Sequence, residues 1–422
     1  MRILHFSTDD ITGGAAKAAY RLHNSLCDAE QDSRMIVLRK RSDDDRVTQA
    51  PAIEVNLWES RFQRLHQFVP GLRAVPPTAN YTFNFDASPQ INLELLLANQ
   101  LEPPEIICLH WITGLLDAQS IRLLHDHFRC PIVWVMADQE PLTGGCHYSF
   151  GCEGFTRECG NCPQLTPSKP NDHSRVTWQR KKKSLSDVPI CFVAPTSWGR
   201  ERLRQSSLFR RHRCELIPYP IDAQTFRPFE QSVARDLLRL PQDKKIIFFG
   251  STYLEDRRKG MPLLIKAFDS PAIRSLDNLF LLVAGLNGNQ LMSKLSLPGK
   301  YIGQLQDELT LALAYQAADI FVCPSVEDAG PMMIPEAMMC GTPVVAFKTG
   351  GAPDLIEPGK NGYLSKFADA DDLAIGVLTL LNADDGMAFR VSALGKARQV
   401  HLPETVTKRH LELYQSLRSV CK

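Results

Sequence analysis

At 422 residues the chain is too long for one ordinary hydrophobic core, so two domains are expected. Its 44% hydrophobic and 23% charged residues are typical of a globular protein in water, and a net charge of +1 argues against a nucleic-acid partner. The first residues lack the apolar stretch of a signal peptide, and no apolar run reaches the roughly 20 residues that span a bilayer. We therefore expect a cytoplasmic protein without a transmembrane helix.

Short apolar runs alternate with helical patterns along the chain, which is typical of βα units and parallel sheets. In the first half, strands are predicted at 1–7, 34–40, 105–111, 131–137 and 191–197. A proline-bearing segment at 217–229 has little periodicity and is predicted to be a linker. Further strands are predicted at 244–250, 279–285, 319–325 and 342–347.

These patterns predict an α/β fold with two doubly wound, Rossmann-like domains, at residues 1–222 and 223–402. Residues 403–422 have an amphipathic pattern and are expected to form a helix that packs back on the first domain. In open α/β sheets ligands bind beyond the carboxyl ends of the strands. The sequence therefore predicts a binding site in a cleft between the domains.

The segment that follows the strand at 319–325 carries the most chemical information. It is a loop with acids and glycine, and a helix is expected to start near Met332. The free backbone N–H groups of a helix start suit a diphosphate. Glu336 is placed to bind the vicinal hydroxyls of a ribose, and Asp328 those of a donor sugar. The alternative is an acidic helix cap followed by a solvated glutamate.

Residues 324–364, beginning PSVEDAGPMMIPEAMMCGTPVV, resemble the family 4 glycosyltransferases, which are retaining enzymes of the GT-B fold with the signature P-S-x-x-E-G-x-G. In register, Asp328 takes the place of the first family glutamate and Glu336, eight residues on, that of the second. The resemblance implies that the first acid contacts the donor sugar and the second the ribose. The loop positions expected to face the donor also include Gly330, Met332 and Met333.

Two departures from the family pattern lie in this loop. The first acid is an aspartate, which is one methylene shorter, with Glu327 beside it. Pro331 stands at the second glycine position, and the glycine lies one residue earlier. Both departures concern the contact with the donor sugar rather than the contact with the ribose.

Residues 248–268 resemble the family segment in which a strand ends in glycine and a Lys-Gly pair follows. The resemblance implies that Lys259 binds the donor diphosphate, with Arg257 or Arg258 in place of an arginine that the family has where this chain has Ser251. Such cations would stabilise the leaving group without a metal, so no catalytic cofactor is expected. The alternative is a solvated basic turn. Farther along, Gln304 and Leu305 match the positions near the nucleotide base.

In the first half, Gly13 and Gly14 follow the first strand and open a helix. A tight turn would explain them, whereas in the family this loop faces the diphosphate and the acceptor. His110 ends a strand in the sequence LHW, and its likeness to the family's cleft histidine implies contact with the donor sugar or the reaction centre. A lone strand histidine is otherwise a structural residue.

Residues 131–165 resemble a subset of the family that is linked to exopolysaccharide assembly (colanic-acid type), in which a strand ends in H-D-x-W and leads to T-G-G-C-H-Y. Ala137 stands where the subset has histidine, and the aspartate is retained as Asp138. Asp138 is therefore the candidate acceptor-side residue.

Four cysteines fall in a polar, glycine-rich loop at 143–165, and their spacing is that of a structural Zn²⁺ site. Two disulfides or uncoordinated thiols are the alternatives, and the neighbouring His147 is a further candidate ligand. The proposed ligands are Cys146, Cys152, Cys159 and Cys162.

Two basic runs, at 179–183 and 200–213, are typical of solvated helix faces and could also dock on anionic lipid at the inner face of a membrane. Together the observations predict a metal-independent transferase that moves a sugar, with retention, from a UDP- or GDP-sugar to a glycan or lipid-linked acceptor in polysaccharide or glycan biosynthesis. The alternatives are a sugar-nucleotide 2-epimerase of the same fold and a degenerate protein that only binds a sugar nucleotide.

Overall fold

The computed structural model describes residues 1–52, 89–98 and 102–420, and the chain divides into two compact units. The first unit holds the residues up to Pro195, Gly199–Ile217 and the last helix from Thr407, and the second holds Thr196–Trp198 and Pro218–Val406. The linker therefore changes unit at Ile217, a few residues before the expected boundary at 222. The reason is local hydrogen bonding, since the Ile221 N–H donates to the His401 carbonyl oxygen at 2.9 Å.

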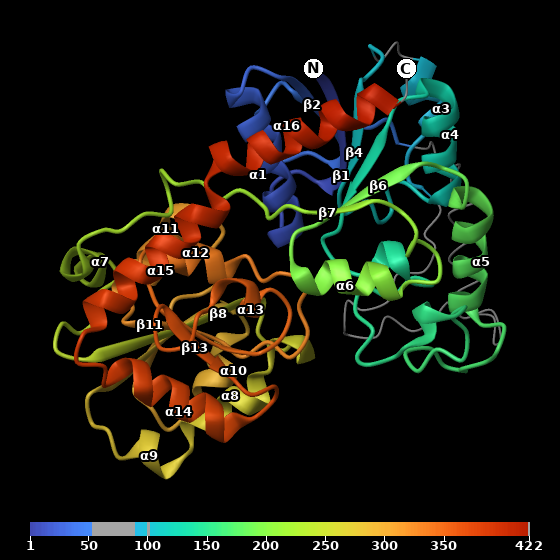
Figure 1. Cartoon of the computed structure of the whole chain (residues 1–422). Coiled ribbons are helices and arrows are strands. Elements are labelled where there is room, and N and C mark those ends of the chain that lie inside the picture. Colours follow the sequence, from blue (N-terminus) through green and yellow to red (C-terminus); the bar gives the residue numbers. More distant parts are fainter. Residues whose placement is uncertain (53–88, 99–101, 421–422) are drawn as a thin grey trace. The chain divides into compact units, whose positions relative to one another are not determined.

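The first unit contains a seven-stranded parallel sheet in the order β3-β2-β1-β4-β5-β6-β7 (Figure 1). Its strands are β1 (Arg2–Asp9), β2 (Asp32–Arg39), β3 (Val47–Gln49), β4 (Ile106–Leu109), β5 (Ile132–Val135), β6 (Ile190–Ala194) and β7 (Cys214–Leu216). The helices along this part of the chain are α1 (Gly14–Asp28), α3 (Leu93–Ala98), α4 (Ala118–Phe128), α5 (His173–Leu185) and α6 (Ser197–Gln205). The central strands are buried and nearly all apolar, as expected when helices cover both faces of a sheet.

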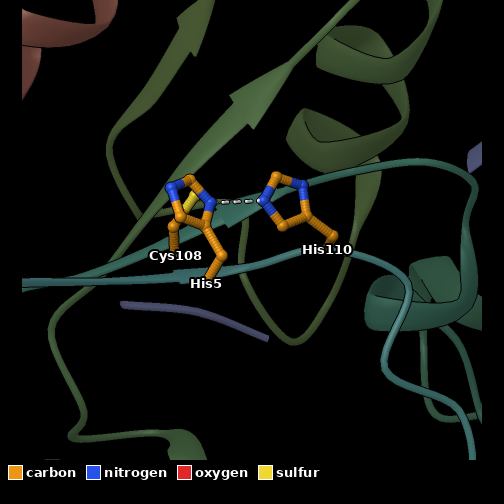
Figure 2. A group of neighbouring side chains, drawn as sticks. All are labelled: His5, Cys108 and His110. Carbon is orange, nitrogen blue, oxygen red and sulfur yellow. Dashed lines mark hydrogen bonds between the residues drawn. The ribbon is translucent and has the colours of Figure 1, made fainter. Parts of the chain in front are cut away.

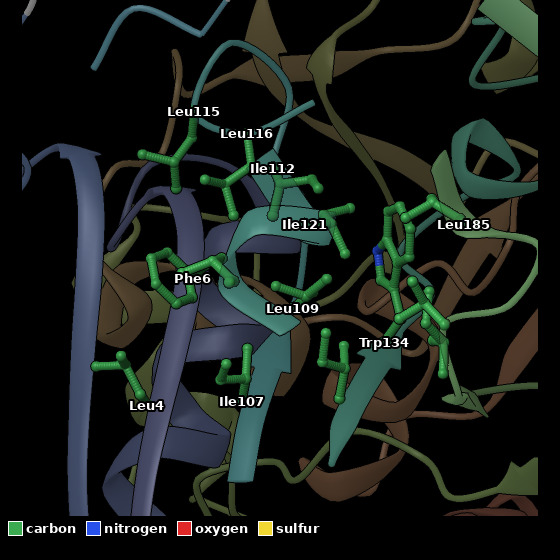
Figure 3. Close-up of a cluster of buried hydrophobic side chains, with 14 of the residues drawn as sticks. Leu4, Phe6, Ile107, Leu109, Ile112, Leu115, Leu116, Ile121, Trp134 and Leu185 are labelled. Carbon is green, nitrogen blue, oxygen red and sulfur yellow. The ribbon is translucent and has the colours of Figure 1, made fainter. Parts of the chain in front are cut away.

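The core of the first unit lies over the centre of its sheet, as Figure 3 shows. Phe6 of β1, Leu109 of β4 and Trp134 of β5 are buried there with side chains from the loop after β4. The Trp134 indole N–H donates to the His110 carbonyl oxygen at 3.2 Å, which satisfies the polar atom of a fully buried ring. This packing fixes the carboxyl ends of β4 and β5. His110 directly follows β4, and Asp138 lies in the loop after β5.

The last helix, α16 (Pro403–Val420), joins the first unit from Thr407 onward. Its Tyr414 is fully buried, and the hydroxyl lies 3.7 Å from the Cys108 Sγ of β4. Arg213 donates to the Ser416 hydroxyl at 3.0 Å, near the edge strand β7. The C-terminal helix thus packs along the same unit as the N-terminal strand.

The second unit contains a six-stranded parallel sheet in the order β10-β9-β8-β11-β12-β13. Its strands are β8 (Lys245–Tyr253), β9 (Leu279–Leu286), β10 (Gly299–Tyr301), β11 (Ile320–Cys323), β12 (Val344–Phe347) and β13 (Gly362–Ser365). Its helices are α7 (Gln231–Leu237), α8 (Met261–Phe268), α9 (Pro271–Arg274), α10 (Gly288–Met292), α11 (Glu308–Ala317), α12 (Met333–Met339), α13 (Ala352–Leu355), α14 (Ala370–Leu381) and α15 (Gly386–His401).

Alternate side chains of β8 enter two different cores, because successive residues of a strand point to opposite faces of the sheet. Ile246 and Phe248 pack with residues of α11, α12 and α15, whereas Ile247 and Phe249 pack with residues of α8 and α14. Both sheets are therefore covered on two sides, which is the doubly wound arrangement that the sequence predicts. No helix in the described part of the chain combines the length and the apolar character needed to cross a bilayer.

Candidate functional site

The loop after β8 and the loop after β11 meet in the second unit and bring a lysine onto an aspartate. A short 3-10 helix, η3 (Arg257–Lys259), follows β8 and ends at Gly260. Gly260 has a φ of 67°, and a Cβ at this position would lie 1.8 Å from the Pro324 carbonyl oxygen. Only glycine allows this approach. It places the Lys259 Nζ 2.6 Å from the Asp328 Oδ2.

Asp328 is buried, and its charge is compensated by the neighbouring cations. Burial alone would raise the pKa of Asp328, but the charges of Lys259 and Arg258 outweigh burial, so the pKa lies below its usual value. Arg258 also pairs with Asp256 at 2.5 Å, whereas Arg257 is exposed. Arg258 is therefore the arginine that acts on the Asp328 carboxylate in this structure.

The loop that carries Asp328 is held from two other segments of the second unit. The Thr196 hydroxyl donates to the Ala329 carbonyl oxygen at 2.6 Å, and the Gly330 N–H donates to the Asp328 Oδ1 at 3.2 Å. At Gly350, with a φ of 56°, a Cβ would lie 2.1 Å from the Asp328 carbonyl oxygen. The carboxylate is thus fixed by its own backbone contacts as well as by the lysine.

Glu336 lies on α12 and is only 4% exposed. Its Oε2 lies 3.3 Å from the Tyr315 hydroxyl of α11. Burial, and then the charge of Glu336, raise the pKa of Tyr315 well above its usual value, so this hydroxyl stays protonated and donates. The structure places Glu336 and Asp328 at the two ends of one short segment.

The remaining expected donor contacts of the second unit lie on loops and on the helix start. Met332 and Met333 are half-buried against the core, and a Cβ on Gly250 would lie 2.9 Å from the Met333 Cε. Gln304 is exposed in the loop after β10, and Leu305 is half-buried beside it. These positions share the end of the sheet at which β8, β10 and β11 finish.

At the start of the first unit, Gly13 and Gly14 are exposed between β1 and α1. Gly13 has a φ of 90°, and a Cβ on either glycine would meet no heavy atom of the described chain within 4 Å. A tight backbone conformation therefore explains Gly13. Packing against the described chain requires glycine at neither position.

His110 is 2% exposed. Figure 2 shows its ring facing that of His5, with Cys108 beside them. The His110 Nε2 lies 2.9 Å from the Nδ1 of His5, which comes from β1, and the Cys108 thiol lies close by. Burial, followed by the charges of neighbouring histidines, lowers the pKa of His110 to about 3, so the ring is neutral at physiological pH. His5 is not among the residues predicted from the sequence, because a polar residue inside an apolar strand gives no signal of its partner.

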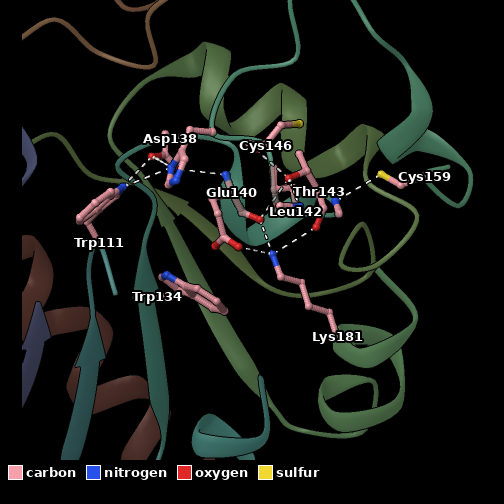
Figure 4. A network of polar contacts seen from close by, with 12 residues as sticks. Trp111, Trp134, Asp138, Glu140, Leu142, Thr143, Cys146, Cys159 and Lys181 are labelled. Atoms are coloured by element: carbon pink, nitrogen blue, oxygen red, sulfur yellow. Dashed lines mark hydrogen bonds and ion pairs between the residues drawn. The ribbon is translucent and has the colours of Figure 1, made fainter. Parts of the chain in front are cut away.

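Asp138 follows β5 and is held by donors of the first unit (Figure 4). The Trp111 indole N–H donates to its Oδ2 at 3.1 Å, and the Glu140 N–H donates to its Oδ1 at 2.8 Å. His147 of the cysteine loop lies 2.5 Å from the same Oδ2. Burial lowers the pKa of His147, but Asp138 outweighs burial and the pKa lies above its usual value. The sequence analysis considered His147 only as a metal ligand and missed this pair.

One residue of the basic run at 179–183 is neither solvated nor available to lipid. Lys181 is 6% exposed, and its Nζ donates to the Glu140 Oε1 at 2.6 Å and to the Thr143 carbonyl oxygen at 3.1 Å (Figure 4). The exposed residues of this run, Arg180, Lys182 and Lys183, keep the solvated positions that a helix face predicts. Lys181 anchors the start of the cysteine loop instead.

Comparisons with known proteins place this geometry in context. Residues 243–383, all within the second unit, match the family model described as "Glycosyl transferases group 1". The D-inositol 3-phosphate glycosyltransferase 2 of Catenulispora acidiphila is 30% identical over 182 residues, which are 40% of this chain and 42% of that protein. The D-inositol 3-phosphate glycosyltransferase of Segniliparus rotundus is 26% identical over 300 residues, which are 68% of this chain and 63% of that protein. The chain thus spans less than two thirds of the length of these curated relatives.

Solved structures match over nearly the whole chain. The sucrose-phosphate synthase of Thermosynechococcus elongatus aligns with a TM-score of 0.70 at 19% identity and covers 99% of both chains. An Anabaena protein, HepE, solved in complex with UDP-glucose, aligns with a TM-score of 0.67 at 17% identity over 98% of this chain and 99% of that chain. The fold is therefore the GT-B type with two parallel-sheet, Rossmann-like domains, and the second unit carries the sequence pattern of the glycosyltransferase group 1 family.

Proposed function

We propose that this protein is a glycosyltransferase that takes a sugar from a nucleoside diphosphate sugar. The observation that carries the proposal is the 2.6 Å pair between Lys259 and the buried Asp328, at the carboxyl ends of β8 and β11. In open α/β sheets this is the edge at which ligands bind. The family match includes both residues, and a structural relative was solved with UDP-glucose.

The proposed roles follow from charge. Lys259 binds the diphosphate and Asp328 binds hydroxyl groups of the donor sugar, with Arg258 as the second cation. Oriented cations at the diphosphate stabilise the negative charge that develops on the leaving group, so the proposed reaction needs no metal. The bond between the sugar C1 and the diphosphate oxygen breaks as a bond from C1 to the acceptor oxygen forms on the same face. The acceptor's proton leaves on the departing diphosphate.

Further contacts complete the proposed donor site. Glu336, fixed beside Tyr315, is assigned to the ribose hydroxyls. The nucleotide base, of UDP or GDP, is assigned to the loop at Gln304 and Leu305. The loop positions assigned to the diphosphate are Gly13, Gly14, Gly330, Met332 and Met333.

In the first unit, Asp138 is assigned to the acceptor side. His110 is assigned to the reaction centre through its neutral ring, which can donate or accept a hydrogen bond without adding charge.

The acceptor that we infer is a hydroxyl of a glycan or of a lipid-linked saccharide, in polysaccharide or glycan biosynthesis on the cytoplasmic side. The names of the curated relatives make a phosphorylated polyol the competing acceptor class. Exposed arginines on and after α6, among them Arg204 and Arg210, would allow docking on an anionic membrane. Sedimentation with vesicles that contain anionic lipid tests this docking, because binding should fall as salt rises.

Product analysis separates the proposed transferase from its alternatives. UDP-glucose and GDP-mannose are each supplied with and without saccharide acceptors and inositol phosphate, and sugars and nucleotides are identified by mass spectrometry and NMR. The proposal predicts nucleoside diphosphate and a glycoside of retained anomeric configuration when an acceptor is present. An epimerised nucleotide sugar from donor alone would instead identify an epimerase. Tight nucleotide binding without any product would identify a degenerate binding protein.

A further inference from the structure

The loop between β5 and α5 gathers four thiols around one cavity. Between the 3-10 helix η1 (Glu140–Leu142) and α5, the chain forms only one short helix, η2 (Gly154–Thr156). The cavity is lined by apolar Phe155, by small or polar residues of the same loop and by Ser174 of α5. All four thiols are free of disulfides and line this cavity: Cys146, Cys152, Cys159 and Cys162.

Backbone amides point at two of these sulfurs. The Gly144 N–H donates to the Cys159 Sγ at 3.2 Å, and the Gly154 N–H donates to the Cys152 Sγ at 3.4 Å. A Cβ on Gly154 would lie 3.5 Å from the Cys152 Sγ and 3.9 Å from the Cys159 Sγ, so the backbone approaches both sulfurs closely. Such amides favour the negative charge of a thiolate over the neutral thiol.

The cavity lining contains four thiols and no charged side chain. The Cys146 thiol lines one cavity with the three other cysteines, so forming several thiolates together there carries an electrostatic penalty. A bound divalent ion removes this penalty, because a coordinating thiol is deprotonated outright. Four sulfurs with no carboxylate ligand suit Zn²⁺ in a closed tetrahedral site.

We propose that Cys146, Cys152, Cys159 and Cys162 bind one structural Zn²⁺. Each thiol gives its proton to solvent when it binds, and no oxidation takes place. Among the described residues, only His5, Cys108 and His110 form a group of three or more His, Cys, Asp or Glu side chains whose ligand atoms all lie within 4.8 Å of one another. The four sulfurs of the loop are farther apart than this. Binding therefore draws the four sulfurs inward from their separation around the cavity, to the Zn–S distance of about 2.3 Å.

This metal site also positions the histidine that pairs with Asp138. His147 follows Cys146 directly, and its carbonyl oxygen accepts from the Gln139 N–H at 3.0 Å. The Thr143 hydroxyl donates to the Cys146 carbonyl oxygen at 2.7 Å. Fixing Cys146 on the metal therefore fixes His147 against Asp138. His147 is held in place by the metal site and is not one of its ligands. The inference holds for the first unit alone and does not rest on the proposed transferase activity.

Metal analysis of the purified full chain tests the site. We expect about one zinc per chain in the native protein and in Cys191→Ala, a control that removes a buried thiol of β6 outside the loop. Cys152→Ala and Cys162→Ala should lose the zinc. Loss of zinc in Cys108→Ala, with retention in the loop variants, would overturn the proposal in favour of the His5–Cys108–His110 cluster. Absence of zinc from native protein, even after dialysis against the metal, would also overturn it.

A second measurement avoids variants that fail to fold. Native protein is loaded with Co²⁺ and its absorption spectrum is recorded, because thiolate ligands and tetrahedral geometry give intense, characteristic bands. A thiol reagent is then added with and without a chelator. The proposal predicts a tetrahedral thiolate spectrum and four additional reactive thiols after chelation. A spectrum without thiolate bands would contradict the proposal, as would a number of reactive thiols that is the same with and without the chelator.

Discussion

The two units differ in how they place their paired polar side chains. In the second unit, Lys259 is 23% exposed in its side chain and meets Asp328 at the rim of a sheet, where a ligand can compete for both. In the first unit, His5 and His110 are closed into the interior, and one nitrogen of each ring lies 2.9 Å from one nitrogen of the other. An accessible ion pair is suited to exchange its partner for a substrate, whereas the protonation of a buried neutral pair affects the stability of the fold.

The largest effect is expected from Lys259→Ala. Removing the cation takes away the stabilisation of the leaving diphosphate, and losses of about 10²–10³ in kcat are typical when such an electrostatic group is removed. Lys266→Ala on the exposed side of α8 is the matched control and should change kcat little. Steady-state kinetics with the donor identified by product analysis measures both. Equal losses in the two variants would show that lysine charge in general, rather than this site, matters.

The buried histidines predict a loss of stability in acid. His110 and His410 have pKa values lowered to about 3, chiefly by burial, so the unfolded chain binds protons before the folded chain does. Stability is complete above the ordinary histidine pKa of about 6.5 and falls as pH drops below it, by up to about 1.4 kcal/mol per pH unit for each histidine.

Urea unfolding between pH 7.5 and 4.5 measures this slope. His410→Phe should make the slope shallower, whereas His127→Gln, an exposed control on α4, should not. A slope that is the same in all three proteins would contradict the assignment of neutral buried rings.

Gly260→Ala should be more destabilising than Gly13→Ala. A Cβ on Gly260 would lie 1.8 Å from the Pro324 carbonyl oxygen, so the two loops would have to separate. Gly13 has open space around its Cβ position and would carry only the strain of its backbone conformation, φ 90° and ψ 164°, about 1–3 kcal/mol. Thermal unfolding ranks the two variants. If Gly13→Ala is the less stable variant, Gly260 does not pack closely against the Pro324 carbonyl oxygen.

A smaller effect is expected for Asp138→Asn. The carboxylate's charge on His147 is lost while its shape is kept, so the pKa of His147 should fall, and stability should drop by about 1–3 kcal/mol as a buried pair is broken. NMR titration of the His147 ring measures the first change, and His173→Gln serves to assign an exposed signal. An unchanged pKa of His147 in Asp138→Asn would show that the two side chains do not form an ion pair.

The sequence predicts the central strands well and the edge strands poorly. Each predicted run corresponds to a strand in the interior of a sheet, because only there does burial on both faces demand a continuous apolar stretch. Three of the four sheet edges, β3, β7 and β13, lie outside the predicted strands. Segments such as VTQ and GKY are short and part-exposed, and their pairing depends on the neighbouring strand rather than on their own residues.

The candidate site, like the edge strands, could be predicted only in part from the sequence. Motif spacing singles out Lys259 and Asp328 separately, but their contact depends on Gly260 passing against the Pro324 carbonyl oxygen, a tertiary fact. The pairing of Asp138 with His147 likewise depends on how the cysteine loop folds back. Residue type and local order give the candidate chemistry, and long-range packing decides which candidates meet.

The most direct test of the central claim is calorimetric titration of UDP and GDP into the native protein, Lys259→Ala and Lys266→Ala. We predict that one nucleotide binds the native protein and Lys266→Ala alike. Lys259→Ala should bind it about 10–150-fold more weakly, as expected for the loss of a charge-assisted hydrogen bond of about 1.5–3 kcal/mol. Equal affinity in all three proteins would contradict the claim that the Lys259–Asp328 pair marks the sugar-nucleotide site.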